Sequence, residues 1–248
     1  MNKRFEEFIE KSRNSKEYAE HYYKEADLRK GLFELDTEFL NKLLVPKGKI
    51  FDATMGRGRH IIYFAKKGYE VTGNDHNPYM VELVKEGLKK NSLKAGLYNL
   101  DIIDLSEIKD NSFDYVICMY GSLGCIPGSD NREKAVSEFL RIVKKGGLVV
   151  IHAHNRLANI GYLQHLGWTF KTYFWRDNDL ELGDRYLADK YQRGSYVHIF
   201  SPSEMKEIFY KARLKIIKEV YLDKNQDEYY RGRFKNLRSG GFIFTGRK

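Results

Sequence analysis

The chain has 248 residues, of which 42% are hydrophobic and 31% charged, a composition typical of a globular protein with a sizeable core. No apolar run approaches the 18 residues of a membrane-spanning helix, and the charged N-terminus lacks the apolar stretch of a signal peptide. The formal net charge of +9 leaves two interpretations open, an anionic partner such as RNA or a lysine-rich surface.

The two cysteines, Cys118 and Cys125, both stand next to apolar residues. Cysteines in that setting indicate small apolar packing groups in a reducing compartment, not a disulfide framework. We therefore expect a cytoplasmic protein with no zinc site or other metal site.

The first 45 residues predict an N-terminal helical cap. Residues 6–30 are charged and amphipathic, and residues 32–44 carry apolar side chains at spacings of three and four. The Pro-Lys-Gly sequence at 46–48 ends this pattern.

From residue 46 to 154, short apolar runs alternate with helical patterns. Such alternation predicts right-handed βαβ crossovers and a parallel sheet covered by helices on both faces. The predicted strands are 49–53, 69–75, 97–101, 113–120 and 148–154, and the predicted helices are 59–68, 78–90 and 131–147.

The regular rhythm stops after His154. Residues 155–200 predict an insertion that serves as a substrate lid, irregular through residue 193 and ending in a short strand at 196–200. Six large aromatic side chains in it could roof a pocket: Tyr162, Trp168, Phe170, Tyr173, Phe174 and Trp175. Residues 201–248 then predict a helix, a strand, a loop with interleaved basic and aromatic residues, and a last strand. We interpret residues 1–248 as one domain.

The sequence "FDATMGRGRH" (51–60) predicts a ligand site at the end of the first strand. Gly56 and Gly58 would let the backbone approach a ligand closely, and Asp75 ends the second strand 19 residues after Gly56. A dinucleotide motif would require a third glycine where Ile61 stands. Asp52, four residues before Gly56, suits a positively charged ligand better than a pyrophosphate.

These stretches resemble, in order, the motifs of the class I S-adenosylmethionine-dependent methyltransferases. The resemblance covers about residues 32–220 and includes "VTGNDHNPYM", "NLDIIDL", "FDYVICMYGSLGCI" and "FLRIVKKGGLVVI". It implies an α/β fold with a doubly wound, seven-stranded, mostly parallel, Rossmann-like sheet whose last strand is antiparallel. It also implies S-adenosyl-L-methionine as the cofactor.

The resemblance further implies a set of cofactor-binding residues. Asp75 would hold the ribose, Asp101 would accept from the adenine amino group, and Ile102 would flank the adenine ring. The other positions that it implies around the cofactor are Asp52, Thr54, Gly56, Gly58, His76 and Tyr120. Thr54 and Arg57 depart from the small residues that the family often has there.

Locally, the sequence is most similar to the glycine and sarcosine N-methyltransferases. The shared features are the helical N-terminus, the exit "YGSLGCIPG" from the fourth strand, and an asparagine just past the fifth strand. This resemblance implies that Asn155 faces the methyl acceptor and that Arg29 meets the cofactor carboxylate.

His154, His198 and Tyr120 are the other candidates for the acceptor side. His154 would lie at the carboxyl end of the fifth strand, where a histidine can take a proton near neutral pH. Each has a structural alternative: a hydrogen-bonded strand end for His154, core packing for Tyr120, and a position away from the site for His198. His152, two residues before His154, is expected to pack.

We expect methyl transfer to N or O of a small molecule. No "N/D-P-P-Y/F" motif follows the fourth strand, which argues against a DNA amine methylase. RNA methylation remains an alternative because the segment Tyr229–Arg238 interleaves aromatic and basic residues. A cofactor-binding protein without catalysis is a second alternative. The sequence predicts no oligomeric state.

Overall fold

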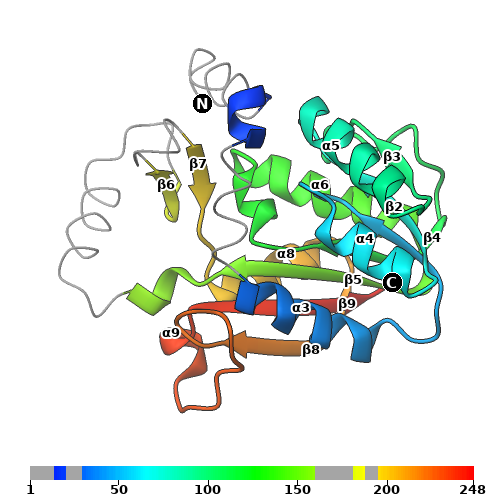
Figure 1. Cartoon of the computed structure of the whole chain (residues 1–248). Helices are drawn as coiled ribbons and strands as arrows, with labels where there is room; N and C mark the ends of the chain where they lie inside the picture. Colours follow the sequence, from blue (N-terminus) through cyan, green and yellow to red (C-terminus); the bar gives the residue numbers. More distant parts are fainter. Residues whose placement is uncertain (1–13, 21–29, 160–180, 188–194) are drawn as a thin grey trace.

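The computed structural model describes residues 14–20, 30–159, 181–187 and 195–248. Within these ranges, seven strands form one sheet in the order β3-β2-β1-β4-β5-β9-β8 (Figure 1). The strands are β1 Lys49–Asp52, β2 Glu70–Asn74, β3 Gly96–Tyr98, β4 Phe113–Cys118, β5 Val143–His154, β8 Lys215–Leu222 and β9 Gly241–Arg247. Strands β1 to β5 are mutually parallel, and β9 runs antiparallel to both β5 and β8. The predicted mostly parallel sheet with an antiparallel last strand is confirmed.

Helices cover both faces of this sheet (Figure 1). The described helices are α3 Lys30–Leu43, α4 Arg59–Lys66, α5 Pro78–Lys90, α6 Ser129–Ile142, α8 Pro202–Lys211 and α9 Lys235–Arg238, with 3-10 turns η1 Ser122–Cys125 and η2 Arg156–Asn159. Residues 16–20 are also helical. A separate two-stranded sheet pairs β6 Asp184–Leu187 with β7 Ser195–His198.

Alternation along the strands divides the core into two layers. Successive strand residues point to opposite faces, so Ile50 packs with α3, α4 and α5 while Phe51 packs with α6 and α8. Ile117 and Val116 on β4 divide in the same way. The strands are therefore apolar on both sides, as buried parallel strands are.

The helix starts follow from local sequence. Pro78 occupies the first turn of α5, and the Asn77 side chain accepts from the backbone N–H of Tyr79. Helix α8 starts with a capping box between Ser201 and Glu204. Within the described residues, no helix is both long enough and apolar enough to span a bilayer.

The predicted helix 131–147 is wrong at its C-terminal end. Helix α6 stops at Ile142, and Val143 is extended and pairs with Phe113 of β4. The Lys144 ammonium lies 2.7 Å from the Asp114 carboxylate. Sheet pairing thus overrides the local helical pattern, and β5 begins five residues earlier than the apolar run indicates.

The order of the strands places the site. The chain moves outward in one direction from β1 to β3 and in the other direction from β4, so β1 and β4 flank the switch point. Ligands in such sheets bind beyond the carboxyl ends of the strands at that point.

Candidate functional site

The loop after β1 is shaped by glycines that cannot carry a side chain. Gly56 and Gly58 have φ values of 51° and 73°, in the left-handed region. A Cβ on Gly58 would lie 2.8 Å from Val84, and a Cβ on Gly73 would lie 2.3 Å from the Met55 sulfur. The loop is therefore packed tightly onto β2 and α5, and its backbone forms one wall of the site.

Asp52 lies at the end of β1 with one carboxylate oxygen unsatisfied. The side chain is buried, and Oδ1 accepts from the Thr54 N–H at 3.3 Å. Oδ2 has no hydrogen-bond partner among the described residues, and the His60 Nδ1 lies 3.9 Å from it. Burial raises the pKa of Asp52 to about 7. Burial also lowers the pKa of His60 to about 3, so His60 is neutral and supplies no charge to Asp52.

The next strand ends beside this loop. The Asp75 carboxylate accepts from the N–H of Gly56 at 2.8 Å and from the N–H of Asn77 at 2.9 Å. Burial raises the pKa of Asp75 in spite of these two hydrogen bonds. His76 is exposed, and its Nε2 lies 3.0 Å from the Asn14 side-chain nitrogen. Asp75 therefore bridges the glycine loop and the start of α5.

Asp101 and Ile102 follow β3. The Asp101 side chain is exposed, and its Oδ1 accepts from the Ile103 N–H at 3.1 Å, which makes a local turn. Ile102 is buried in the layer that contains α6 and α8. The structure thus brings the predicted residues of β1, β2 and β3 to one edge of the sheet, with Asp101 at its outer end.

Tyr120 and Gly121 form the exit from β4, and both have positive φ values, 61° and 73°. The Arg59 guanidinium lies 4.3 Å from the centroid of the Tyr120 ring and 5.4 Å from that of Phe33 on α3. Arg59 thus contacts one aromatic ring from the turn after β4 and one from α3, a favourable cation–π arrangement.

Thr54 and Cys118 meet under the glycine loop. The Thr54 Oγ1 lies 3.7 Å from the Cys118 Sγ. Burial raises the pKa of the Cys118 thiol to about 12, so the sulfur is a packing group and not a thiolate nucleophile. The β-branched Thr54 therefore directs its hydroxyl toward β4.

Asn155 is held by the C-terminal segment. Its side chain is buried, and its Nδ2 donates to the carbonyls of Asn236 and Ser239, each at 2.9 Å, and lies 3.0 Å from the Ser239 hydroxyl. Its Oδ1 accepts from the Leu157 N–H. Both ends of the amide are thus engaged within the fold, and the contact with the acceptor that the resemblance implied for Asn155 stays a prediction.

His152 and His154 lie on one face of β5, and both contact Gln226. The His154 Nδ1 lies 3.1 Å from the Gln226 Oε1, and the His152 Nε2 lies 3.0 Å from the same oxygen. His152 is buried, as expected, while His154 is half-buried and its ring packs against Gly121. His154 therefore stands beside the exit of β4.

His198 lies in a buried charged network at the base of the predicted lid. Its Nδ1 and Nε2 lie 2.6 Å from carboxylate oxygens of Asp184 and Glu204. Burial alone would lower the pKa of His198, but the two carboxylates outweigh it and raise the pKa. His198 is thus held between two carboxylates, and its backbone lies against η1, the turn that follows β4, because a Cβ on Gly124 would lie 2.2 Å from the His198 carbonyl oxygen.

This network is balanced in charge. Glu181 pairs with Arg132, and Arg156 lies 3.4 Å from Glu204. The Glu181, Asp184 and His198 ligand atoms lie within 4.8 Å of one another, a spacing that could hold a metal ion. However, the three carboxylates (Glu181, Asp184 and Glu204) are already paired with two guanidinium groups and one imidazole. The geometry therefore favours a set of ion pairs that stabilises the fold over a metal site.

Some predicted features lie outside the described ranges. They are Arg29, the parts of the predicted helical segment 6–30 at residues 6–13 and 21–29, and the parts of the predicted lid at residues 160–180 and 188–194, which include the six aromatic residues between 162 and 175.

Three residues of the site region were missed by the sequence interpretation. Asn74 is buried, and its amide contacts the backbone of Ala53 and of Leu100, which ties three loops together. Asp36 on α3 is fully buried, with neither carboxylate oxygen hydrogen-bonded to the described residues, and burial raises its pKa. Asp36 could have been found from the sequence, because it is an acid at an apolar position of the helical pattern 32–44. No feature of the sequence singles out Gln226.

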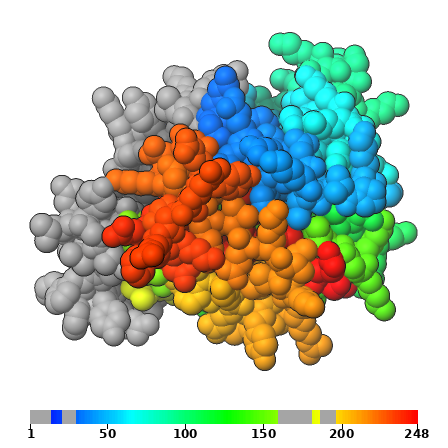
Figure 2. Space-filling view, turned by 90° about the horizontal axis from the view of Figure 1, so that it is seen from below, coloured from blue at the N-terminus to red at the C-terminus, as the bar shows by residue number. Residues whose placement is uncertain are grey.

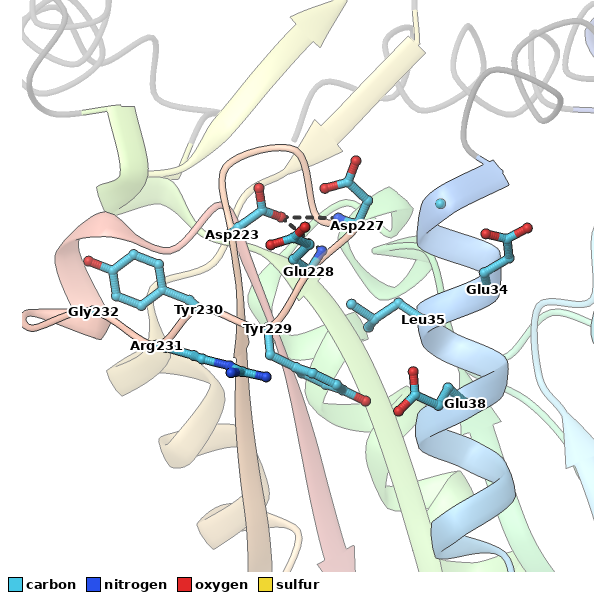
Figure 3. A pocket seen from close by; sticks show the side chains of 11 residues that line it. Glu34, Leu35, Glu38, Asp223, Asp227, Glu228, Tyr229, Tyr230, Arg231 and Gly232 are labelled. Atoms are coloured by element: carbon cyan, nitrogen blue, oxygen red, sulfur yellow. Dashed lines mark hydrogen bonds between the residues drawn. The ribbon is translucent and has the colours of Figure 1, made fainter.

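A pocket of about 780 Å³ lies between α3 and residues 223–232 (Figure 3). Its lining includes the carboxylates Glu34, Glu38, Asp223, Asp227 and Glu228, the aromatic rings Tyr229 and Tyr230, and one guanidinium group, Arg231. The space-filling view shows this orange segment lying against the blue α3 (Figure 2). The pocket is therefore strongly acidic although the chain is basic.

Comparison with known proteins matches the central part of the chain. Residues 50–147 fit the family model described as a methyltransferase domain. A glycine/sarcosine N-methyltransferase of Parasynechococcus marenigrum is 24% identical over 167 residues, which cover 66% of this chain and 58% of that protein. A tRNA (uracil(54)-C(5))-methyltransferase of Pyrococcus horikoshii is 33% identical over 94 residues, or 37% of this chain and 22% of that protein. The chain spans less than two thirds of the first curated relatives that it matches.

Among solved structures, an S-adenosylmethionine-dependent methyltransferase of Methanosarcina mazei has the same fold. The TM-score is 0.68 at 22% identity, and the match covers 85% of this chain and 96% of that one.

Proposed function

We propose that this chain, a class I S-adenosylmethionine-dependent methyltransferase, transfers the methyl group of its cofactor to a nitrogen or oxygen of a small molecule. The observation that carries the proposal is the buried, unsatisfied Asp52 Oδ2 beside a backbone loop packed tightly at Gly58. In its ionised form a buried carboxyl needs a positive partner, and neutral His60 does not provide one. The ammonium group of the cofactor's methionine fits this position.

The remaining cofactor contacts are proposed from the edge formed by β1, β2 and β3. Asp75 would accept from the ribose hydroxyls, and Asp101 would accept from the adenine amino group. Ile102 would flank the adenine ring. The cofactor supplies a methyl group on a sulfonium, and the leaving thioether is neutral. The protein then has to orient the acceptor and exclude water, and it needs a base only where the acceptor must lose a proton.

The acceptor side is proposed at the exits of β4 and β5. Tyr120 and Gly121 leave β4 there, and the His154 ring packs against Gly121. His154 would accept the proton of an acceptor that must lose one. Because the Asn155 amide is held by residues 236 and 239, we assign Asn155 a structural role in shaping this edge.

The acidic pocket favours a small molecule over RNA. Its five carboxylates lie beside the segment 229–238 that would have to contact phosphates, and they would repel a phosphate backbone. In addition, the Lys235 ammonium lies 4.6 Å from the centroid of the Tyr221 ring. Lys235, although exposed, thus has an aromatic partner within the protein.

The test is methyl transfer from radiolabelled cofactor to a panel that includes glycine, sarcosine, dimethylglycine, other small amines and alcohols, and bulk tRNA. We expect incorporation into at least one small molecule and none into tRNA, with the Asp52→Asn variant as the control for cofactor-dependent transfer. Tight cofactor binding without transfer to any acceptor would favour the non-catalytic alternative.

RNA methylation is the second candidate, because Arg231, Arg233 and Lys235 are exposed and a tRNA-modifying relative matches part of the chain. Binding of bulk tRNA is measured at two salt concentrations. Contact with phosphates makes log affinity fall with log salt by about 0.7 per contact on single strands. The RNA reading requires that affinity drop when these three residues become Ala and remain unchanged when Lys85, Lys89 and Lys90, exposed on α5, become Ala.

A further inference from the structure

Gln226 joins two histidines at the proposed acceptor side. His152 and His154 are two residues apart on β5, and their ring centroids lie 5.6 Å apart with the rings near perpendicular. The Gln226 Oε1 lies 3.0 Å from the His152 Nε2 and 3.1 Å from the His154 Nδ1. A carbonyl oxygen has two lone pairs and can accept from both rings at once.

The fold builds a defined position for this side chain. Gln226 has a φ value of 64°, and its N–H donates to the Asp223 carbonyl. The Asp223 carboxylate accepts from the N–H groups of Asn225, Asp227 and Glu228, as Figure 3 shows in part. These hydrogen bonds order the loop and direct Gln226 inward, toward β5.

Gly241 leaves the space that the amide occupies. Gly241 pairs with His154 across β5 and β9, and a Cβ on it would lie 2.5 Å from the Gln226 Oε1. Any other residue at 241 would displace the amide from the two rings.

A proton on the His154 Nδ1 determines what the other ring nitrogen can do. When Nδ1–H donates to the Gln226 Oε1, the neutral ring carries its lone pair on Nε2. The Nε2 edge of the ring faces the exit of β4, because a Cβ on Gly121 would lie 2.8 Å from Nε2. The lone pair then lies on the side where the acceptor is proposed.

The amide nitrogen of Gln226 also lies 3.0 Å from the His154 Nδ1. A ring with a bare Nδ1 could accept from that nitrogen instead. However, that hydrogen bond is lost when the ring becomes an imidazolium, which donates at both nitrogens. The hydrogen bond from Nδ1–H to the Gln226 Oε1 persists before and after proton uptake at Nε2. It is therefore the contact that is compatible with His154 acting as a base.

We propose that Gln226 is a positioning residue that holds neutral His154 as the Nδ1–H tautomer, with the Nε2 lone pair directed to the methyl acceptor. This inference rests on the proposed function in its use of His154 as a base. The tautomer itself can be measured without any acceptor.

The experiment uses the full chain with ¹⁵N-labelled histidine and S-adenosylhomocysteine as the probe. The ¹⁵N chemical shifts of the neutral His154 ring, assigned with a His154→Gln variant, identify the protonated nitrogen. We expect Nδ1–H in the wild type and in Gln226→Glu, which retains an acceptor oxygen. Gln226→Met removes that oxygen and should shift the ring toward Nε2–H, and Asn225→Met, exposed on the same loop, should have no effect.

Turnover with an acceptor found in the panel gives the second readout. Gln226→Met should lower kcat about 10- to 100-fold with the KM for the cofactor unchanged, and Gln226→Glu should restore much of kcat while raising the pH of half-maximal rate. Nε2–H in the wild type, or an unchanged tautomer in a folded Gln226→Met protein, would overturn the proposal. If the panel yields no acceptor, the proposed function fails while the ¹⁵N shifts still decide the role of Gln226.

Discussion

Cofactor binding should depend on the ionisation of Asp52. Burial raises the pKa of this carboxyl to about 7 in the cofactor-free protein, with a further contribution from the nearby charge of Asp75. In the proposed site, Asp52 pairs with the ammonium group of the cofactor, and only the ionised carboxyl can do so. Binding near pH 6 must therefore remove a proton from Asp52, and affinity should fall as the pH drops below about 7.

The size of the effect follows from the ionised fraction. With a pKa of about 7, roughly half of the molecules are ionised at pH 7 and about 3% at pH 5.5, which corresponds to about a 15-fold loss of affinity. This range keeps the cofactor's amino group protonated, because an α-amino group titrates at about 7.7–8.0. Close to one proton should be released per cofactor bound at pH 5.5.

Isothermal titration calorimetry in two buffers of different ionisation enthalpy measures both quantities. In Asp52→Asn, affinity at pH 7 should fall by about 10- to 100-fold, and the dependence on Asp52 ionisation should disappear. Asp101→Asn, which changes an exposed carboxyl at the same edge, serves as the control and should retain the wild-type pH profile. Equal wild-type affinity at pH 5.5 and pH 7 without proton release would refute the reasoning.

Three further predictions follow from the contacts described above. Asp75→Ala should weaken cofactor binding by about 10- to 100-fold in calorimetry, because it removes a charged acceptor, and should create no affinity for NAD. Asn155→Ala should destabilise the protein by about 2–4 kcal/mol in denaturant unfolding, because it removes buried hydrogen bonds to the C-terminal segment, while cofactor affinity stays within twofold. Weak cofactor binding in a stable Asn155→Ala protein would contradict that role. His198→Gln should lower thermal stability most near pH 6 and less toward pH 9: the pKa of His198 is raised on folding, so its contribution is complete below about pH 6.5 and is lost as the pH rises through the folded value. A constant difference between pH 6 and pH 9 would show that His198 does not change its charge on folding.

The strands of the sheet were predicted well because they are short apolar runs bounded by glycine, proline and charged residues. The glycines at 56 and 58 and the acids at 52 and 75 could be assigned to one edge from their places at strand ends. The end of α6 was predicted too late because residues 143–147 continue the helical pattern and end in two glycines, which are typical of a helix C-terminus. In the structure, Val143 instead pairs with β4 and starts a strand.

The acceptor side was harder to predict because it depends on contacts distant in sequence. His154 was placed at a strand end correctly, but its partner Gln226 lies 72 residues away. Asn155 resembled an acceptor contact, yet its amide is held by residues more than 80 positions later. His198 was expected at the site because its strand was assigned to a substrate cover, and its two carboxylate partners were not foreseeable from spacing. The roles of all these residues, the lid and the cytoplasmic location stay predictions.

The place of β9 has a consequence for how the protein forms during synthesis. Residues 241–247 pair with β5 on one side and with β8 on the other. Neither strand can complete its pairing until this segment, which is translated long after β5, has been made. Until then, β5 presents an unpaired apolar edge, and such edges invite pairing with other chains. A nascent or truncated chain that stops before residue 241 should therefore retain the β1–β3 half of the molecule but aggregate through β5. Ribosome-bound intermediates of this length are expected to depend on chaperones that cover exposed strands.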